Sequence, residues 1–381
     1  MAIHLTLALT FFNFVGVNAA RVVLTLYALE LDAPAAAVGI LGGLFYLFPL
    51  LLSWPIGALA DRLGARGLLL FAAACGIVSL LLPYFVRELP AFYVAAALSG
   101  LSLAFFHVTL QNLIGTLSAP EERARNFSNF SLAGSITNFV GPLFAGFSID
   151  HAGHALACLY IASQPLIAIV LVLVWGRLFP SGHPQPAPHE SDSAFSALRD
   201  REILHMLAVG GLVQLGTDLF QFYIPIYGHS IGLSASAIGA ILASFAAASF
   251  VVRLFLARLI QRVPEEKLLA WSFYAGAAGF ALVPFFSNTA ALAVVAFLFG
   301  LGTGLGIPLT VILMFSRTIK GRSGQTLGMR LTANNFVRVA GPIVFGAVGT
   351  VLGLPPVFWI NGGMMVLGGL LSHFGGKSAK T

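Results

Sequence analysis

Charged residues are scarce in this chain of 381 residues. Lys, Arg, Asp and Glu together make up 9% of it, hydrophobic residues make up 58%, and the mean hydropathy is +0.92. A typical soluble domain carries about 25% charged residues. The composition therefore excludes a soluble globular protein and indicates a protein that crosses a membrane several times.

Cysteine is nearly absent, and the sequence signs of β-structure and catalysis are missing. Cys75 and Cys158 both fall inside apolar segments, where we expect two buried small side chains and neither a disulfide nor a metal site. Strand alternation is absent, so the spans are expected to be helices and not a barrel. The glycine-rich stretch 300–308 has no Gly-Lys-Ser/Thr ending, and no nucleophile–base pair occurs. We therefore expect no enzymatic activity, no cofactor and no metal.

Long apolar runs are what the chain does contain. A spanning helix needs about 20 apolar residues, and twelve such runs occur at about 5–29, 34–60, 67–86, 90–116, 125–149, 155–178, 203–228, 234–260, 267–286, 290–315, 325–350 and 354–374. The first run has no basic leader or clear cleavage site, so we interpret it as a span and not a signal peptide. The predicted fold is an all-α polytopic membrane protein with twelve transmembrane helices.

A polar, proline-rich stretch divides the twelve runs into two sets of six. It predicts an N-terminal six-helix bundle at 1–178, a cytoplasmic linker at 179–202, and a C-terminal six-helix bundle with a short cytoplasmic tail at 203–381.

The positive charges are distributed unevenly. Of 20 Lys and Arg residues, 16 fall in alternate loops and the C-terminal tail, Arg87 falls in the opposite loops, and Arg21, Arg253 and Arg338 lie within apolar runs. This positive-inside bias predicts a multi-pass protein of the inner (plasma) membrane with both termini in the cytoplasm. The net charge of +6 follows from that topology, so we expect contact with the lipid bilayer and no nucleic-acid partner.

The two halves of the chain align at an offset of 200 residues. The matching residues are Gly16 and Gly216, Tyr27 and Tyr227, Gly39 and Gly239, Gly100-Leu101 and Gly300-Leu301, Gly141-Pro142 and Gly341-Pro342, and Gly146 and Gly346. This repeat predicts two bundles related by duplication.

A tight charged turn separates the second and third runs, and it reads Gly57-Ala-Leu-Ala-Asp61-Arg62-Leu-Gly64-Ala-Arg66. Its charges must lie at the water boundary, because a charge at the bilayer centre costs about 3 kcal/mol or more. The turn resembles the loop between helices two and three of the major facilitator superfamily, and it departs from that pattern at Ala65. A degenerate copy at 257–267 has Gln261 in place of Asp61 and Pro264 in place of Gly64.

The resemblance extends over nearly the whole chain. It implies two bundles that rock about a midplane site, a monomer, and secondary active transport by alternating access. It also assigns a gating role to Gly57, Asp61, Arg62, Gly64 and Arg66, which latch the halves in the outward-open state. The alternative is that these charges are only a topology signal.

A second, partial resemblance lies in the fifth run. Gly141-Pro142-x-x-Ala145-Gly146 resembles the end of a motif found in drug antiporters of the superfamily. Ser128, Thr137 and Ala145 stand where that motif has glycines, so the match favours export only modestly.

Asp218 is the one acid near the middle of a predicted span. Gln214 and Gln221 share its helical face, and the repeat aligns Asn18 with Asp218 and Arg21 with Gln221. Helices one, four, seven and ten line the cavity in the superfamily, so we expect these five residues to face each other across the substrate path. Asp218 is either a proton carrier or a permanent counter-ion of Arg21.

Other polar side chains lie at membrane depth in the fourth, fifth and eleventh runs. His107, with Gln111 one turn further on, is a second proton-coupling candidate or a neutral core histidine. Asn334 and Arg338 share one stripe of the eleventh run, and Asn138 is the repeat partner of Arg338. Two deep arginines against one acid suggest an anionic substrate; alternatively, amides and carbonyls satisfy Arg338.

The sequence thus predicts a secondary active transporter of a small, anionic organic solute, coupled to protons. One alternative is a proton-driven exporter of amphipathic drugs. Another is a non-transporting membrane receptor or assembly factor on the same scaffold. The sequence leaves the substrate and the direction of transport open.

Overall fold

The computed structural model describes residues 1–119, 121–179, 201–317 and 323–375. Within these residues, eleven helices are long and apolar enough to cross a membrane. The predicted linker, 179–202, lies almost entirely outside them, as does the end of the predicted cytoplasmic tail. The all-helical membrane fold is confirmed.

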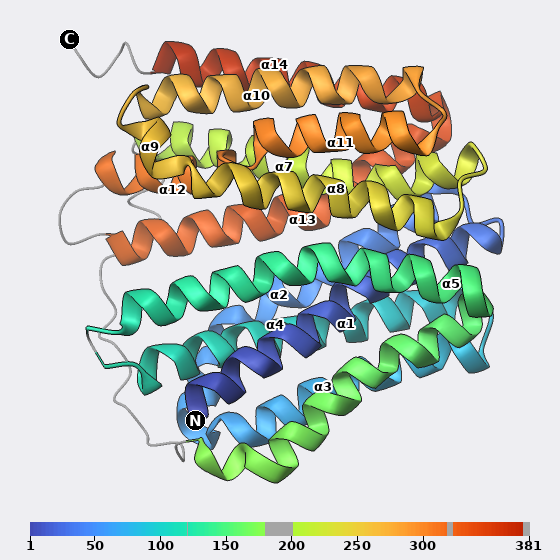
Figure 1. The fold of residues 1–381 in the computed structure, drawn as a ribbon, viewed down its shortest axis with the longest axis vertical. Coiled ribbons are helices and arrows are strands. Elements are labelled where there is room, and N and C mark those ends of the chain that lie inside the picture. Colours follow the sequence, from blue (N-terminus) through green and yellow to red (C-terminus); the bar gives the residue numbers. More distant parts are fainter. Residues whose placement is uncertain (120, 180–200, 318–322, 376–381) are drawn as a thin grey trace.

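The first half forms six spans from five long helices. These are α1 (Ala2–Glu30), α2 (Ala35–Leu63), α3 (Ala65–Phe85), α4 (Leu89–Leu117) and α5 (Arg123–Trp175), followed by the short 3-10 helix η1 (Gly176–Leu178). At Gly153 the backbone leaves the helical region, with φ +79° and ψ 166°. Figure 1 shows α5 turning back on itself, so α5 contains the fifth and sixth predicted spans.

The second half repeats this pattern with more breaks. Its elements are α7 (Arg201–Ser230), α8 (Ala235–Leu254), α9 (Leu256–Ile260), α10 (Glu265–Leu282), η2 (Val283–Phe285), α11 (Thr289–Thr303), α12 (Gly306–Arg317), α13 (Ser323–Leu352) and α14 (Leu354–Gly375). The runs at 234–260 and 290–315, expected to be continuous helices, are each divided in two.

The break between α11 and α12 has a local cause. Pro308 has no N–H and cannot bond to the carbonyl of Gly304, four residues earlier. The side chain of Arg253 supplies the missing donor, since its Nε lies 2.9 Å from that carbonyl oxygen. The glycine-rich stretch therefore bends the helix and gives a buried arginine an acceptor.

The two halves lie side by side, with α1–α5 below and α7–α14 above in Figure 1. The N-terminus, the α2–α3 turn and the α4–α5 turn lie at one end of the molecule, which we call the basic end. The α1–α2, α3–α4 and α7–α8 turns and the bend at Gly153 lie at the opposite end.

The halves touch at this opposite end through glycines of the internal repeat. A Cβ on Gly39 of α2 would overlap the carbonyl oxygen of Pro342 in α13, and a Cβ on Gly239 of α8 would lie 2.5 Å from that of Pro142 in α5. These contacts are equivalent under the offset of 200 residues. They let backbones of opposite halves meet directly, and we call this end the sealed end.

Two hydrogen-bonded caps reinforce the sealed end. The carboxylate of Asp150, in α5, accepts from the N–H groups of Ala235 (3.0 Å) and Ser236 (2.9 Å) at the start of α8. Its repeat counterpart, Thr350 in α13, accepts from the N–H of Ala36 at the start of α2, at 2.9 Å. Each half thus satisfies free N–H groups at a helix start of the other half.

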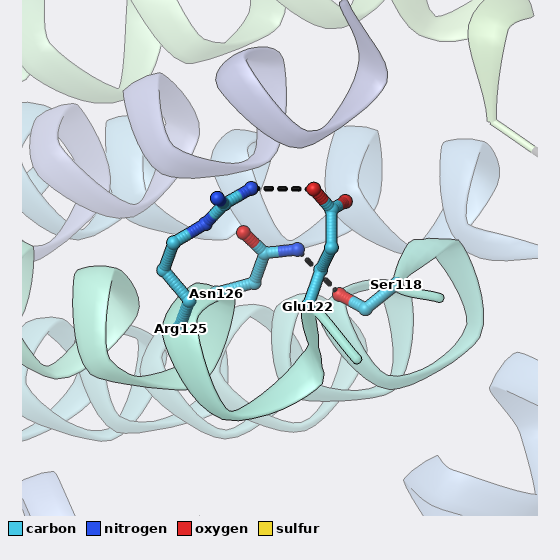
Figure 2. Close-up of polar contacts among 4 residues, drawn as sticks. All are labelled: Ser118, Glu122, Arg125 and Asn126. Atoms are coloured by element: carbon cyan, nitrogen blue, oxygen red, sulfur yellow. Dashed lines mark hydrogen bonds and ion pairs between the residues drawn. The ribbon is translucent and has the colours of Figure 1, made fainter. Parts of the chain in front are cut away.

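The α4–α5 turn at the basic end holds itself together locally. Asn126 donates to the Ser118 hydroxyl at 2.9 Å, and Arg125 is paired with Glu122 at 2.5 Å. Figure 2 shows both contacts. The Asn126–Ser118 bond is buried, whereas the ion pair is exposed to solvent and contributes little to stability.

Candidate substrate cavity

A cavity of about 680 Å³ lies between the two halves. It extends from Tyr46 and Gln221, in the interior, to Gln111, Phe127 and Leu256 near the basic end. Its walls come from α1, α2, α4 and α5 of the first half and from α7, α8, α9, α11, α12 and α13 of the second. Nine predicted substrate or proton residues line it, namely Asn18, Arg21, His107, Gln111, Asn138, Gln214, Asp218, Gln221 and Arg338.

Asp218 is paired with an arginine of α13. Its Oδ2 lies 3.0 Å from Nε of Arg338 and 2.8 Å from Nε2 of Gln214, and only 7% of the Asp218 side chain is exposed. The counter-ion is therefore Arg338, and the expected pairing with Arg21 does not occur. The repeat aligns Arg21 with Gln221, one turn from Asp218, but it is Arg338 of α13 whose side chain reaches the carboxylate.

Arg21 instead lies over the ring of Tyr46, with its Cζ 5.3 Å from the ring centroid. The guanidinium of Arg338 lies over the same ring at 4.8 Å. Among the described residues, Arg21 forms no ion pair, so its charge has no carboxylate partner.

The cavity wall is positively charged. Three arginines line it, Arg21, Arg253 and Arg338, and Asp218 is the one acid among the described lining residues. With His107 neutral, the lining carries a net charge of +2. An isolated buried charge is costly, so this lining favours a ligand that brings negative charge.

Asn18 of α1 and Asn138 of α5 contact each other in the part of the cavity wall that the first half of the protein forms. Nδ2 of Asn18 donates to Oδ1 of Asn138 at 3.0 Å and to the Thr137 hydroxyl at 3.3 Å. The backbones of α1 and α5 come close here, because a Cβ on Gly141 would lie 2.6 Å from Cβ of Asn18. Gly141 thus brings the two amides into contact.

His107 faces the cavity from α4. Its Nε2 lies 3.1 Å from Nε2 of Gln111, and its ring contacts those of Phe14 and Phe130, with centroid separations of 5.8 and 6.1 Å. The side chain is exposed to the cavity although it lies deep within the protein. This polar and aromatic corner can contact the uncharged part of a ligand.

Asn334 does not line the cavity. It is buried in α13 with 7% exposure. Arg330, one turn earlier, donates to the Thr310 hydroxyl at 3.2 Å and to the carbonyl of Ile307 at 3.4 Å, beside the break between α11 and α12. Only Arg338 of this predicted stripe therefore reaches the cavity.

The predicted gating motif lies at the basic end. Gly64 joins α2 directly to α3 with φ +75°, a conformation that favours glycine. Arg62 is exposed, and Nη2 of Arg66 lies 3.4 Å from the carbonyl of Leu173 in the second limb of α5. Gly57 has open space, with Cγ1 of Val108 at 3.9 Å. The side chain of Asp61 lies outside the described part of the structure.

Sequence reasoning did not include Tyr46 or Arg253 among the site residues. Arg253 could have been found, because Pro308 and the glycines before it signal a helix break that exposes a carbonyl. Tyr46 gives no comparable signal, since an aromatic residue in an apolar helix is usually part of the packing.

The fold is that of an all-helical, polytopic membrane protein with a cavity between its two halves. The Major Facilitator Superfamily model matches residues 6–289 and 206–378. The chain therefore belongs to the major facilitator superfamily and is a secondary transporter, not an enzyme.

Relatives and solved structures agree with this assignment. The multidrug resistance protein MdtG of Salmonella choleraesuis (strain SC-B67) is 23% identical over 339 residues, which are 88% of this chain and 84% of that protein. The structure of the nucleoside transporter NupG matches with a TM-score of 0.79 at 15% identity, covering 98% of this chain and 99% of that one. The peptide transporter POT in complex with sulfate matches with a TM-score of 0.78 at 15% identity, covering 98% and 93%.

Proposed function

We propose that this protein transports a small organic anion and couples its movement to protons. The observation that supports this most strongly is the net charge of +2 on the described cavity lining, with Arg21 lacking a carboxylate partner. With the basic end in the cytoplasm, as the charge bias predicts, the cavity faces inward. The anion then binds from the cytoplasm or is released to it.

Asp218 is our candidate proton carrier. Its Oδ2 lies 3.0 Å from Nε of Arg338, and both residues line the cavity. A substrate anion that binds Arg338 competes with Asp218 for the same guanidinium. Asp218 then takes up a proton, so that one anion and one proton cross together.

A thermal-shift screen of the purified protein tests the substrate class. Organic carboxylates and phosphates are compared with lipophilic cations at two pH values. A ligand at 100 times its dissociation constant stabilises by about 2.7 kcal/mol, which is readily measured. We expect anions to stabilise the wild type and to lose that effect in Arg21→Gln, a variant that breaks no described ion pair.

A transport assay in proteoliposomes tests the proton coupling. With an anion from the screen, wild type accumulates substrate in response to an imposed pH gradient, and Asp218→Asn does not. If Asp218→Asn responds to the gradient as wild type does, the proton role is wrong.

A second candidate is a proton-driven exporter of amphipathic compounds. The MdtG relatives are named multidrug resistance proteins, and Phe14, Phe127, Phe130, Phe245 and Phe250 line the cavity. Stabilisation by lipophilic cations alone, with Asp218 required, would favour this candidate over the anion transporter.

A further inference from the structure

The ring of Tyr46, in α2, contacts two guanidinium groups that come from opposite halves of the protein. The Cζ atoms of Arg21, in α1, and Arg338, in α13, lie 5.3 and 4.8 Å from its ring centroid. The tyrosine itself is buried, with 6% exposure. The π-face of an aromatic ring is negative and attracts such cations, so the one ring interacts with an arginine of each half.

The position of Tyr46 is fixed by close backbone packing on both sides of α2. A Cβ on Gly100 of α4 would lie 2.7 Å from the carbonyl oxygens of Leu44 and Phe45, directly before Tyr46. On the other side, a Cβ on Gly43 would lie 2.9 Å from the carbonyl oxygen of Val339, directly after Arg338. The backbone next to Tyr46 is therefore closely packed against both α4 and α13.

The group around the ring has one positive charge in excess. Asp218 neutralises Arg338, whereas Arg21 has no ion pair among the described residues. The polar side chains of Asn18, Asn138 and Gln221 line both the main cavity and a smaller neighbouring one of about 40 Å³. Charged and neutral polar groups thus line the same part of the cavity.

We infer that Tyr46 is a positioning residue that aligns Arg21 and Arg338 into one binding site for a single oxyanion group of the substrate. This inference rests on the proposed function and deepens it, because it specifies how the anion is recognised. A carboxylate, sulfate or phosphate group shares the required chemistry: oxygen acceptors that accept from two guanidiniums. An anion bound there bridges the two halves.

The test measures sulfate binding, because this probe needs no knowledge of the natural substrate. Thermal shifts in sodium sulfate are referred to sodium chloride at equal ionic strength, for wild type, Tyr46→Phe, Tyr46→Leu and Tyr46→Met. We expect Tyr46→Phe to match wild type within about twofold, since phenylalanine keeps the π-face. Tyr46→Leu and Tyr46→Met should weaken sulfate binding about tenfold.

The matched control is Tyr160→Leu, the same substitution at a half-exposed tyrosine of α5 outside the cavity lining. Its sulfate affinity should equal that of the wild type. Tyr46→Met keeps most of the side-chain volume with an adaptable chain, so it provides the result if Tyr46→Leu does not fold. Wild-type affinity in a folded Leu or Met variant would overturn the inference.

The outcomes separate this inference from the proposed function. Sulfate binding that depends on Tyr46, without transport of any organic anion, keeps the inference and rejects the function. Transport of an organic anion with unchanged affinity in Tyr46→Leu or Tyr46→Met keeps the function and rejects the inference. A wild type that binds neither sulfate nor organic anions rejects both.

Discussion

At the scale of single residues, the arrangement around Asp218 decides how the cavity holds its charges. The carboxylate has two partners, Arg338 and Gln214, and is almost entirely buried, whereas 32% of the Arg338 side chain is exposed to the cavity. Asp218 therefore relies on the ion pair for its stabilisation more than Arg338 does, because Arg338 is partly exposed to the cavity. Arg338 also contacts the ring of Tyr46, an interaction that does not involve Asp218.

This asymmetry predicts unequal effects on stability. Arg338→Gln leaves a buried carboxylate without its counter-ion and should lower the free energy of unfolding by about 3 kcal/mol. Asp218→Asn leaves an arginine that still contacts Tyr46 and the cavity, and should cost about 1 kcal/mol. The double variant should be more stable than Arg338→Gln alone. Unfolding in mixed micelles measures all three, and equal losses in the two single variants would contradict the assignment.

At the scale of helices, close glycine contacts determine how the halves meet. Gly39 and Gly239 are repeat partners, and each places its backbone against a proline carbonyl of the other half. Any side chain at these positions must push α2 away from α13, or α8 away from α5. The glycines therefore make the sealed end possible.

Gly39→Ala and Gly239→Ala should open the sealed end. We expect an increase in the distance between spin labels at Leu31 and Leu352, two exposed residues of opposite halves at this end. Gly67→Ala in α3 is the control, because a Cβ there meets nothing within 4 Å. An unchanged label distance in both glycine variants would show that the contact does not hold the end closed.

The break between α11 and α12 leads to a second prediction at this scale. Pro308→Ala restores an N–H that can bond to the carbonyl of Gly304 and compete with Arg253 for it. The helix should straighten, and Arg253 should lose its fixed position in the cavity wall. We expect the KM for transport to rise severalfold while the protein still folds; an unchanged KM would mean that the break does not position Arg253.

At the scale of the whole molecule, the structure is sealed at one end and has its cavity toward the other. Asp150 and Thr350, repeat counterparts, each cap the start of a helix in the opposite half. Alternating access requires these contacts to break once in each transport cycle. We therefore expect these contacts to influence the balance between the two open states.

Removing the Asp150 cap should shift this balance toward the state that is open at the sealed end. A carboxylate at a helix N-terminus contributes about 1 kcal/mol, so Asp150→Ala should change the population ratio about fivefold. Spin labels at Leu31 and Leu352 would report the populations. Asp32→Asn is the control, an exposed acid at the same end that caps no helix start in the described contacts.

The sequence by itself determined the apolar spans, the internal repeat and the family, because these depend on composition, run length and local motifs; it did not show that the runs 234–260 and 290–315 are each broken. It also identified most of the polar residues that line the cavity, since a polar side chain within a membrane span must have polar neighbours or face a cavity. Only the tertiary structure decided that Asp218 pairs with Arg338, that the ring of Tyr46 contacts two arginines, and that Asp150 caps α8. These contacts depend on how each helix is rotated and shifted against its neighbours. That packing depends on many close contacts between residues far apart in the sequence, so it leaves no local pattern there.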